Sequence, residues 1–189
     1  MPVSYLSNNK NVSKMAKFVQ TIKLIVFFIT VTLSSATYAS FDPTLDPSIE
    51  NIDGRLQKLS SYIGHGKWVI LNIWGTRCPP CREEIPELNN FHDQRKNNDA
   101  IVVGIAIDFP SYGYANKKEV IAFVDDYLVD FPILLSDSEI TEKIGLGRLS
   151  GLPTTYVFNP DGEIIGMQVG GITEKILNTF IDNNKTTTP

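Results

Sequence analysis

Residues 68–86 have the sequence WVILNIWGTRCPPCREEIP. The first seven are apolar apart from one asparagine, and they are rich in β-branched and aromatic types, which is typical of a buried strand. After a short break, Pro79 and Pro80 suit the first turn of a helix, where a missing N–H has no intrahelical partner to lose. We therefore expect a strand, a tight loop and a helix that begins next to Cys78.

Cys78 and Cys81 are the only cysteines of the sequence, and they stand at the start of this helix. Their spacing brings the two sulfur atoms within reach of a disulfide. Free N–H groups at the helix start and two flanking arginines would stabilise a thiolate on Cys78. Pro79 and Pro80 oppose this effect, because each removes an N–H, so the acidity of Cys78 stays open. Cys81 is expected to resolve a mixed disulfide with a partner.

Other roles for the cysteine pair fit the sequence less well. A static disulfide is the simplest alternative, but the position at a helix start favours redox chemistry. A zinc site would need two further ligands, and His65 and His92 lack zinc-finger spacing relative to the cysteines. A peroxidase of the peroxiredoxin type would need a threonine three residues before the reactive cysteine, where Gly75 stands.

Residues 1–39 have the order of a secretory signal peptide. Four lysines and no acidic residue precede an apolar run at 24–33, and small residues follow up to Ala39. This order predicts cleavage after Ala39 and export. An uncleaved membrane anchor is the alternative, although the clean apolar run is about half of the ~20 residues that span a bilayer. Residues 40–189 are expected to form one domain.

The charge of residues 40–189 excludes one class of partner. Thirteen basic and 21 acidic residues remain after the leader is removed, which gives a net charge of −8. Such a charge argues against nucleic acid as a partner. A secreted domain with a single Cys-x-x-Cys pair is also no disulfide scaffold, so we expect its disulfide to serve chemistry.

The rest of the sequence alternates between strand and helix signals after an extended lead-in at 40–53. Further strands are expected at 101–107, 131–135, 154–158 and 163–169, with a weaker one at 55–59. Helices are expected at 79–96, 116–127, 136–144 and 173–182, with Asn116, Ser136 and Thr173 as the capping residues of the last three. The turn at 159–162 should join the last two strands as a hairpin. This order indicates an α/β fold, a mixed sheet with helices on both faces.

Two motifs make the sequence similar to a known family. The first is WGTRCPPC at 74–81, followed by Glu84, and the second is GLPTTYVF at 151–158. With these motifs the chain resembles thioredoxin-fold proteins over residues 51–180, and most closely the extracytoplasmic TlpA/ResA-like thiol–disulfide oxidoreductases. Residues 108–144 resemble that family's extra strand–helix insertion.

The resemblance implies roles for single residues. Cys78 would attack a partner disulfide, and Cys81, assisted by Glu84, would resolve the product. Pro153 would follow a cis peptide bond and pack beside the sulfurs; a plain strand-edge proline is the alternative. Contact with the partner would come from Trp74, Arg77, Pro79, Pro80 and Leu152, although Trp74 could serve only as packing beside the sulfurs.

Two positions depart from the general thioredoxin pattern. Asn72 stands where that pattern often has an acidic residue, and Arg77 where it often has a tryptophan. Because Asn72 cannot take a proton, a carboxylate that deprotonates Cys81 must come from elsewhere. Glu84, one helical turn beyond Cys81, is the candidate, and a solvated helix face is its alternative interpretation.

The sequence therefore predicts a periplasmic or otherwise extracytoplasmic thiol–disulfide oxidoreductase that acts mainly as a reductant. The resemblance implies exported proteins such as apocytochrome c as partners, and a membrane-embedded thiol electron donor. We expect a monomer without a metal or a cofactor other than the Cys78–Cys81 disulfide, attached to a membrane only if the leader is retained. An oxidant that forms disulfides, and a non-catalytic module that binds a metal or a partner through its thiols, remain as alternatives.

Overall fold

A computed structural model describes residues 41–185 of the chain. The predicted signal peptide and its cleavage site after Ala39 lie outside the described residues. Within 41–185, no helix has both the length and the apolar character needed to cross a bilayer.

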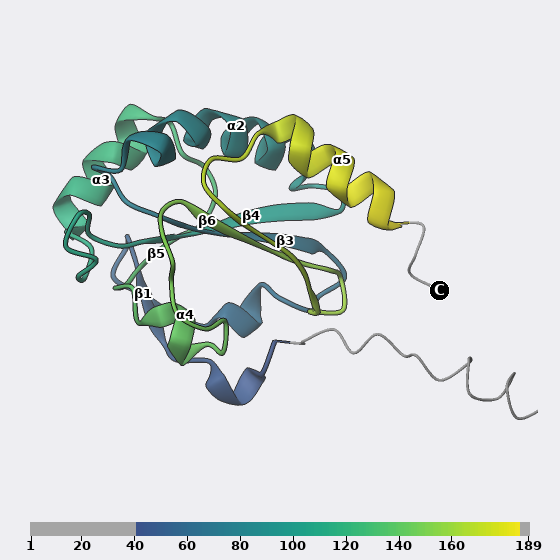
Figure 1. Cartoon of the computed structure of the whole chain (residues 1–189), viewed down its shortest axis with the longest axis horizontal. Coiled ribbons are helices and arrows are strands. Elements are labelled where there is room, and N and C mark those ends of the chain that lie inside the picture. Colours follow the sequence, from purple (N-terminus) through teal and green to yellow (C-terminus); the bar gives the residue numbers. More distant parts are fainter. Residues whose placement is uncertain (1–40, 186–189) are drawn as a thin grey trace, which may run out of the picture. The chain divides into compact units, whose positions relative to one another are not determined.

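A mixed seven-stranded sheet organises the described residues (Figure 1). Its strands are β1 (Ile49–Asn51), β2 (Leu56–Gln57), β3 (Trp68–Trp74), β4 (Ala100–Ala106), β5 (Ile133–Leu135), β6 (Thr154–Phe158) and β7 (Ile164–Val169), in the spatial order β2-β1-β5-β4-β3-β6-β7. β3 pairs in parallel with β4 and antiparallel with β6. All seven residues of β3 are buried, which explains its almost continuous apolar sequence.

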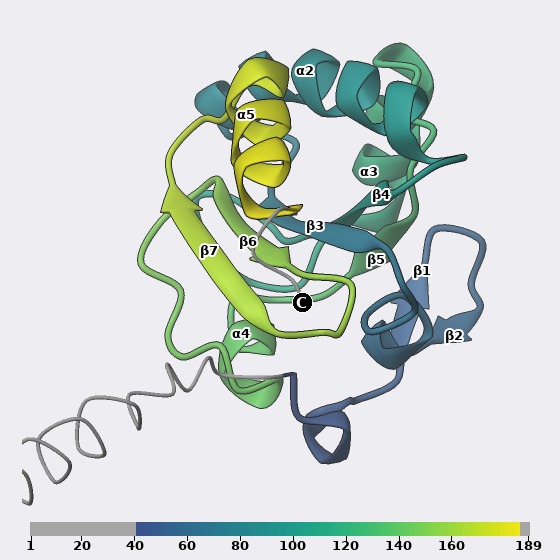
Figure 2. The ribbon, with the colours of Figure 1, turned by 90° about the vertical axis from the view of Figure 1, so that its right-hand side faces the viewer.

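Helices cover both faces of the sheet, as predicted, but unequally. The long helices α2 (Pro79–Arg95), α3 (Lys117–Asp126) and α5 (Glu174–Asn184) share one face, and the short α4 (Ile140–Lys143) lies on the other (Figures 1 and 2). Alternate residues of a strand point to opposite faces. Trp68, Ile70 and Trp74 therefore join the core under the long helices, while Val69, Leu71 and Ile73 join the second core.

The predicted insertion at 108–144 contains α3, β5 and α4. β5 extends the sheet beside β4 in parallel. Asn116 caps α3 as predicted, because its side-chain oxygen accepts from the N–H groups of Lys118 and Glu119. Thr173 caps α5 in the same way.

Three local predictions are wrong, each for a local reason. The lead-in at 40–53 is extended only in part: Ile49–Asn51 forms strand β1, which pairs with β5, but Pro43–Leu45 forms a 3-10 helix. The strand predicted at 55–59 shortens to β2, because the Asp46 carboxylate accepts from the N–H of Leu59 and opens a 3-10 helix there. Ser136 does not cap α4, which begins only at Ile140.

Candidate redox site

The turn after β3 delivers the cysteine pair to the start of α2. A Cβ atom at Gly75 would lie 3.0 Å from the carbonyl oxygen of Ile107, so the close approach of these two segments requires glycine. Cys78 is the N-cap residue of α2 and has the extended backbone conformation predicted for it. Its carbonyl oxygen accepts from the N–H of Arg82 at 3.1 Å. Strand, turn and helix thus fix the position of Cys78.

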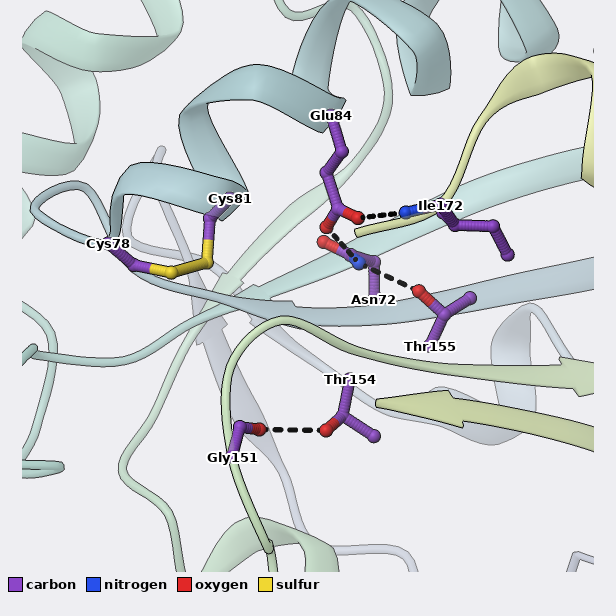
Figure 3. The surroundings of a disulfide bond; sticks show 8 residues. All are labelled: Asn72, Cys78, Cys81, Glu84, Gly151, Thr154, Thr155 and Ile172. Atoms are coloured by element: carbon purple, nitrogen blue, oxygen red, sulfur yellow. Dashed lines mark hydrogen bonds between the residues drawn. A yellow bond between two sulfur atoms is a disulfide. The ribbon is translucent and has the colours of Figure 1, made fainter. Parts of the chain in front are cut away.

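Cys78 and Cys81 form a disulfide, with 2.15 Å between the sulfur atoms and 5.3 Å between the Cα atoms (Figure 3). Both residues are buried, with Cys78 only 1% exposed. They belong to the core under the long helices. Access of a partner sulfur to Cys78 therefore requires the groups around the disulfide to open locally.

The residues predicted to contact a partner differ in their exposure. Arg77, Pro79 and Pro80 are exposed beside the disulfide. Trp74 is fully buried, and the centroid of its ring lies 4.8 Å from that of Phe123 on α3, so it packs in the core next to the site. The structure thus places Trp74 as packing rather than on the surface that meets a partner.

The loop before β6 lies beside the cysteine turn. The Leu152–Pro153 peptide bond is cis, which confirms the conformation that the resemblance implied for Pro153. The Leu152 side chain lies 3.7 Å from the Cβ position of Gly75 and is partly buried against both cores. Pro153 itself is buried.

A second loop beside the site was not predicted. The Phe109 Cβ lies 3.2 Å from the Cβ position of Gly75, and its ring makes an edge-to-face contact with Tyr112. The carboxylate of Asp108 accepts from Arg77 and from Ser111, and these bonds, that of Ser111 first, lower the pKa of Asp108. Sequence periodicity gave no signal for this loop, because a loop of this kind has none.

The two arginines that flank the cysteines have partners of their own. Arg77 is paired with Asp108, and its Nε lies 3.6 Å from the Glu119 carboxylate. The guanidinium of Arg82 lies over the ring of Tyr127, at 5.6 Å from the centroid, and donates to its hydroxyl at 3.1 Å. Carboxylates therefore compensate the positive charge of Arg77, whereas Arg82 contacts a neutral aromatic side chain.

Glu84 is buried under α2 rather than solvated, with only 3% of its surface exposed. Its Oε1 accepts from Nδ2 of Asn72 at 2.8 Å, and its Oε2 accepts from the backbone N–H of Ile172 at 2.9 Å. Nδ2 of Asn72 also donates to the hydroxyl of Thr155 at 3.0 Å. Figure 3 shows how α2, β3, β6 and the segment before α5 bring these groups together.

Burial raises the pKa of Glu84 to about 7, although the hydrogen bonds from Asn72 and Ile172 act in the opposite direction. A carboxyl group with such a pKa exchanges protons readily near neutral pH, as a general acid or base must. Glu84 lies one turn beyond Cys81 on α2. Within residues 41–185, the carboxylate in this disulfide form is hydrogen-bonded to Asn72 and Ile172 and to no sulfur.

Asn72, Thr155 and Ile172 were not predicted to surround Glu84. A sequence signal existed only for Asn72, a polar residue in the middle of an apolar strand. His92, considered above as a zinc ligand, instead accepts from the backbone N–H of Val102 through Nδ1 at 3.0 Å, and burial lowers its pKa. Within the described range, no three His, Cys, Asp or Glu side chains are grouped so that they could hold a metal.

Comparisons with known proteins agree with this geometry. Residues 42–167 match the model of the AhpC/TSA family. Thioredoxin-like protein YneN of Bacillus subtilis is 34% identical over 72% of this chain and 75% of its own length. Thiol-disulfide oxidoreductase ResA of Halalkalibacterium halodurans is 30% identical over 71% of this chain and 70% of its own.

Among solved structures, a thioredoxin-family thiol:disulfide interchange protein of Chlorobium tepidum matches with a TM-score of 0.66 at 22% identity, over 79% of this chain and 97% of that one. This likeness shows the fold, and the curated relatives show the family. The chain belongs to the AhpC/TSA family and is a TlpA/ResA-like thiol–disulfide oxidoreductase with the thioredoxin fold.

Proposed function

We propose that this oxidoreductase works outside the cytoplasm as a reductant of exported proteins, with apocytochrome c among its substrates. The observation that carries the proposed direction is the buried carboxyl group of Glu84, one turn beyond Cys81. The basic, apolar and small-residue order of 1–39 supports export. The curated relative named thiol-disulfide oxidoreductase ResA supports the chemistry.

The reaction consists of two thiol–disulfide exchanges. The Cys78 thiolate attacks one sulfur of a partner disulfide, that S–S bond breaks, and the second partner sulfur leaves as a thiolate that takes up a proton. The Glu84 carboxylate then takes the proton from the Cys81 thiol. The Cys81 thiolate attacks the Cys78 sulfur, the mixed disulfide breaks, and the remaining partner sulfur leaves as a thiolate that takes up a proton. The partner gains two electrons, and the Cys78–Cys81 disulfide is restored.

The charges around the site favour a reductant over an oxidant. A strong oxidant is one whose reduced form is stabilised, as by positive groups that hold a thiolate. Here the carboxylates of Asp108 and Glu119 are paired with Arg77, so this arginine adds little stabilisation to a thiolate. An ionised Glu84 close to the cysteines would disfavour a thiolate further. Both effects make a thiolate in the reduced form less favourable and thereby favour the disulfide.

A redox titration of the pair against a dithiol buffer tests the direction. We expect a potential below about −250 mV, in the range of reducing thioredoxins, because the thiolate has little stabilisation. A potential near about −120 mV would instead support a disulfide-forming oxidant. Cell fractionation with N-terminal sequencing tests the compartment, and a cytoplasmic protein that retains residues 1–39 would contradict export. A membrane-embedded thiol donor is proposed to reduce the pair again.

A further inference from the structure

Only the NH₂ group of the Asn72 side-chain amide makes hydrogen bonds within the described residues. Asn72 is fully buried in β3, and its Nδ2 donates to both Glu84 and Thr155. Its Oδ1 has no hydrogen-bond partner within the described part of the chain. Because buried polar atoms are rarely left without a partner, this oxygen requires an explanation.

The observed hydrogen bonds suit only one protonation state of Glu84. Both carboxylate oxygens face N–H donors, one from Asn72 and one from Ile172. An ionised carboxylate accepts both bonds, but a protonated one carries an O–H that needs an acceptor. Neither N–H can serve as that acceptor. The unused Oδ1 of Asn72 belongs to the side chain that already contacts Glu84.

We propose that Asn72 is a positioning residue whose amide turns by half a rotation when Glu84 gains a proton. With Glu84 ionised, Nδ2 donates to Glu84 and to Thr155, as observed. With Glu84 protonated, Oδ1 takes the place of Nδ2 and accepts from the O–H of Glu84 and the hydroxyl of Thr155. The hydroxyl can serve in both states because it both donates and accepts.

In each state this exchange keeps two hydrogen bonds on the side of the amide that faces Glu84 and Thr155. The proton that Glu84 takes from the Cys81 thiol leaves a thiolate on that sulfur, so the total charge of the site is unchanged by the transfer. The carboxyl group thereby passes between its two forms without an unpaired O–H in the core. The inference rests on the proposed role of Glu84 as proton acceptor.

Two other titratable residues lie one helical turn from Glu84 on α2. Cys81 precedes it, and Glu87 follows it, with a carboxylate that accepts from the backbone N–H of Glu174 at the start of α5. β3 and β6 contribute Asn72 and Thr155, which do not titrate. Burial and hydrogen bonds, with no contribution from another described charge, determine the pKa of Glu84. The amide should therefore respond to the protonation of Glu84 itself.

Nuclear magnetic resonance of the labelled, oxidised protein tests the proposal. The carboxyl carbon shift of Glu84 follows its protonation, and nuclear Overhauser effects between the Asn72 NH₂ group and Thr155 follow the amide. At high pH we expect nuclear Overhauser effects between the Asn72 NH₂ group and Thr155. On acidification they should disappear at the pH where Glu84 titrates. Titration of Glu84 with an unchanged Asn72 pattern would overturn the inference and leave the proposed proton transfer standing.

The Glu84→Gln variant tests the amide without any titration. Its carbonyl can accept from Ile172, and its NH₂ group must then donate to Oδ1 of Asn72, so the turned amide is expected at every pH. If Glu84→Gln showed the nuclear Overhauser effects between the Asn72 NH₂ group and Thr155 that the wild type shows at high pH, the inference would also be overturned. Glu87→Gln is the matched control, because it removes a carboxylate one turn further along α2, outside the Asn72 network, and it should keep the wild-type transition.

Discussion

Replacing Glu84 by glutamine is expected to change how the stability of the oxidised protein depends on pH. Burial raises the pKa of Glu84 from 4.5 to about 7 on folding. The folded state therefore keeps this proton over a range in which the unfolded state releases it. The stabilisation is complete below pH 4.5 and is lost as the pH rises to about 7. One pKa unit corresponds to about 1.4 kcal/mol, so the loss amounts to about 3 kcal/mol.

Urea unfolding of the oxidised wild type and of Glu84→Gln between about pH 4 and pH 8.5 measures this effect. The disulfide prevents the cysteines from titrating. Other titratable groups are common to both proteins, including His92, whose pKa burial lowers. The difference between the two free energies of unfolding therefore reports residue 84 alone. As the pH rises across this range, the free energy of unfolding of the variant should increase by about 3 kcal/mol relative to that of the wild type.

A difference that stays constant from acid to alkaline pH would refute the raised pKa of Glu84 and, with it, the physical basis of its proposed role. Glu87→Gln is again the matched control. It lies on the same helix but outside the contacts of Asn72, and it should retain the slope that Glu84 produces.

Two further predictions concern the packing and the charge around the site. Gly104→Ala should lower the free energy of unfolding by about 1–3 kcal/mol, because the added Cβ would lie 2.7 Å from the Ile133 side chain and 3.0 Å from Nε1 of Trp74. Gly171→Ala is the control in the same urea unfolding measurement, because a Cβ added there meets no atom within 4 Å beyond its chain neighbours. Equal losses of unfolding free energy in the two variants would contradict the close packing at Gly104. Arg77→Gln should hardly change the pH midpoint at which the reduced protein is alkylated by iodoacetamide, because Asp108 and Glu119 already compensate its charge. A large upward change of that midpoint would show that Arg77 acts on the thiolate directly.

The sequence predicted the parts of the site that depend on local order. The apolar run of β3, the prolines at the start of α2 and the cysteine spacing are all contiguous, so the strand, the turn and the disulfide could be predicted. The position of Glu84 one turn after Cys81 followed from helical geometry. Its burial did not, because the backbone N–H that binds it belongs to Ile172, 88 residues later.

Contacts between segments that are distant in sequence also explain why β1 and the loop at Asp108 were not predicted. β1 has only three residues, and its position in the sheet comes from pairing with β5, far along the chain. The loop that carries Asp108 and Phe109 is held against the cysteine turn by Arg77 and by the space beside Gly75. Neither feature has a periodic sequence pattern, and both depend on contacts between segments that are distant in sequence.

Reduction of insulin disulfides by the wild type, Cys78→Ser and Cys81→Ser tests most directly that this cysteine pair exchanges electrons with other proteins. We predict turnover by the wild type, none by Cys78→Ser, and a trapped mixed disulfide through Cys78 in Cys81→Ser. Turnover that survives in Cys78→Ser, or a wild type that binds metal tightly and reduces no insulin, would contradict it.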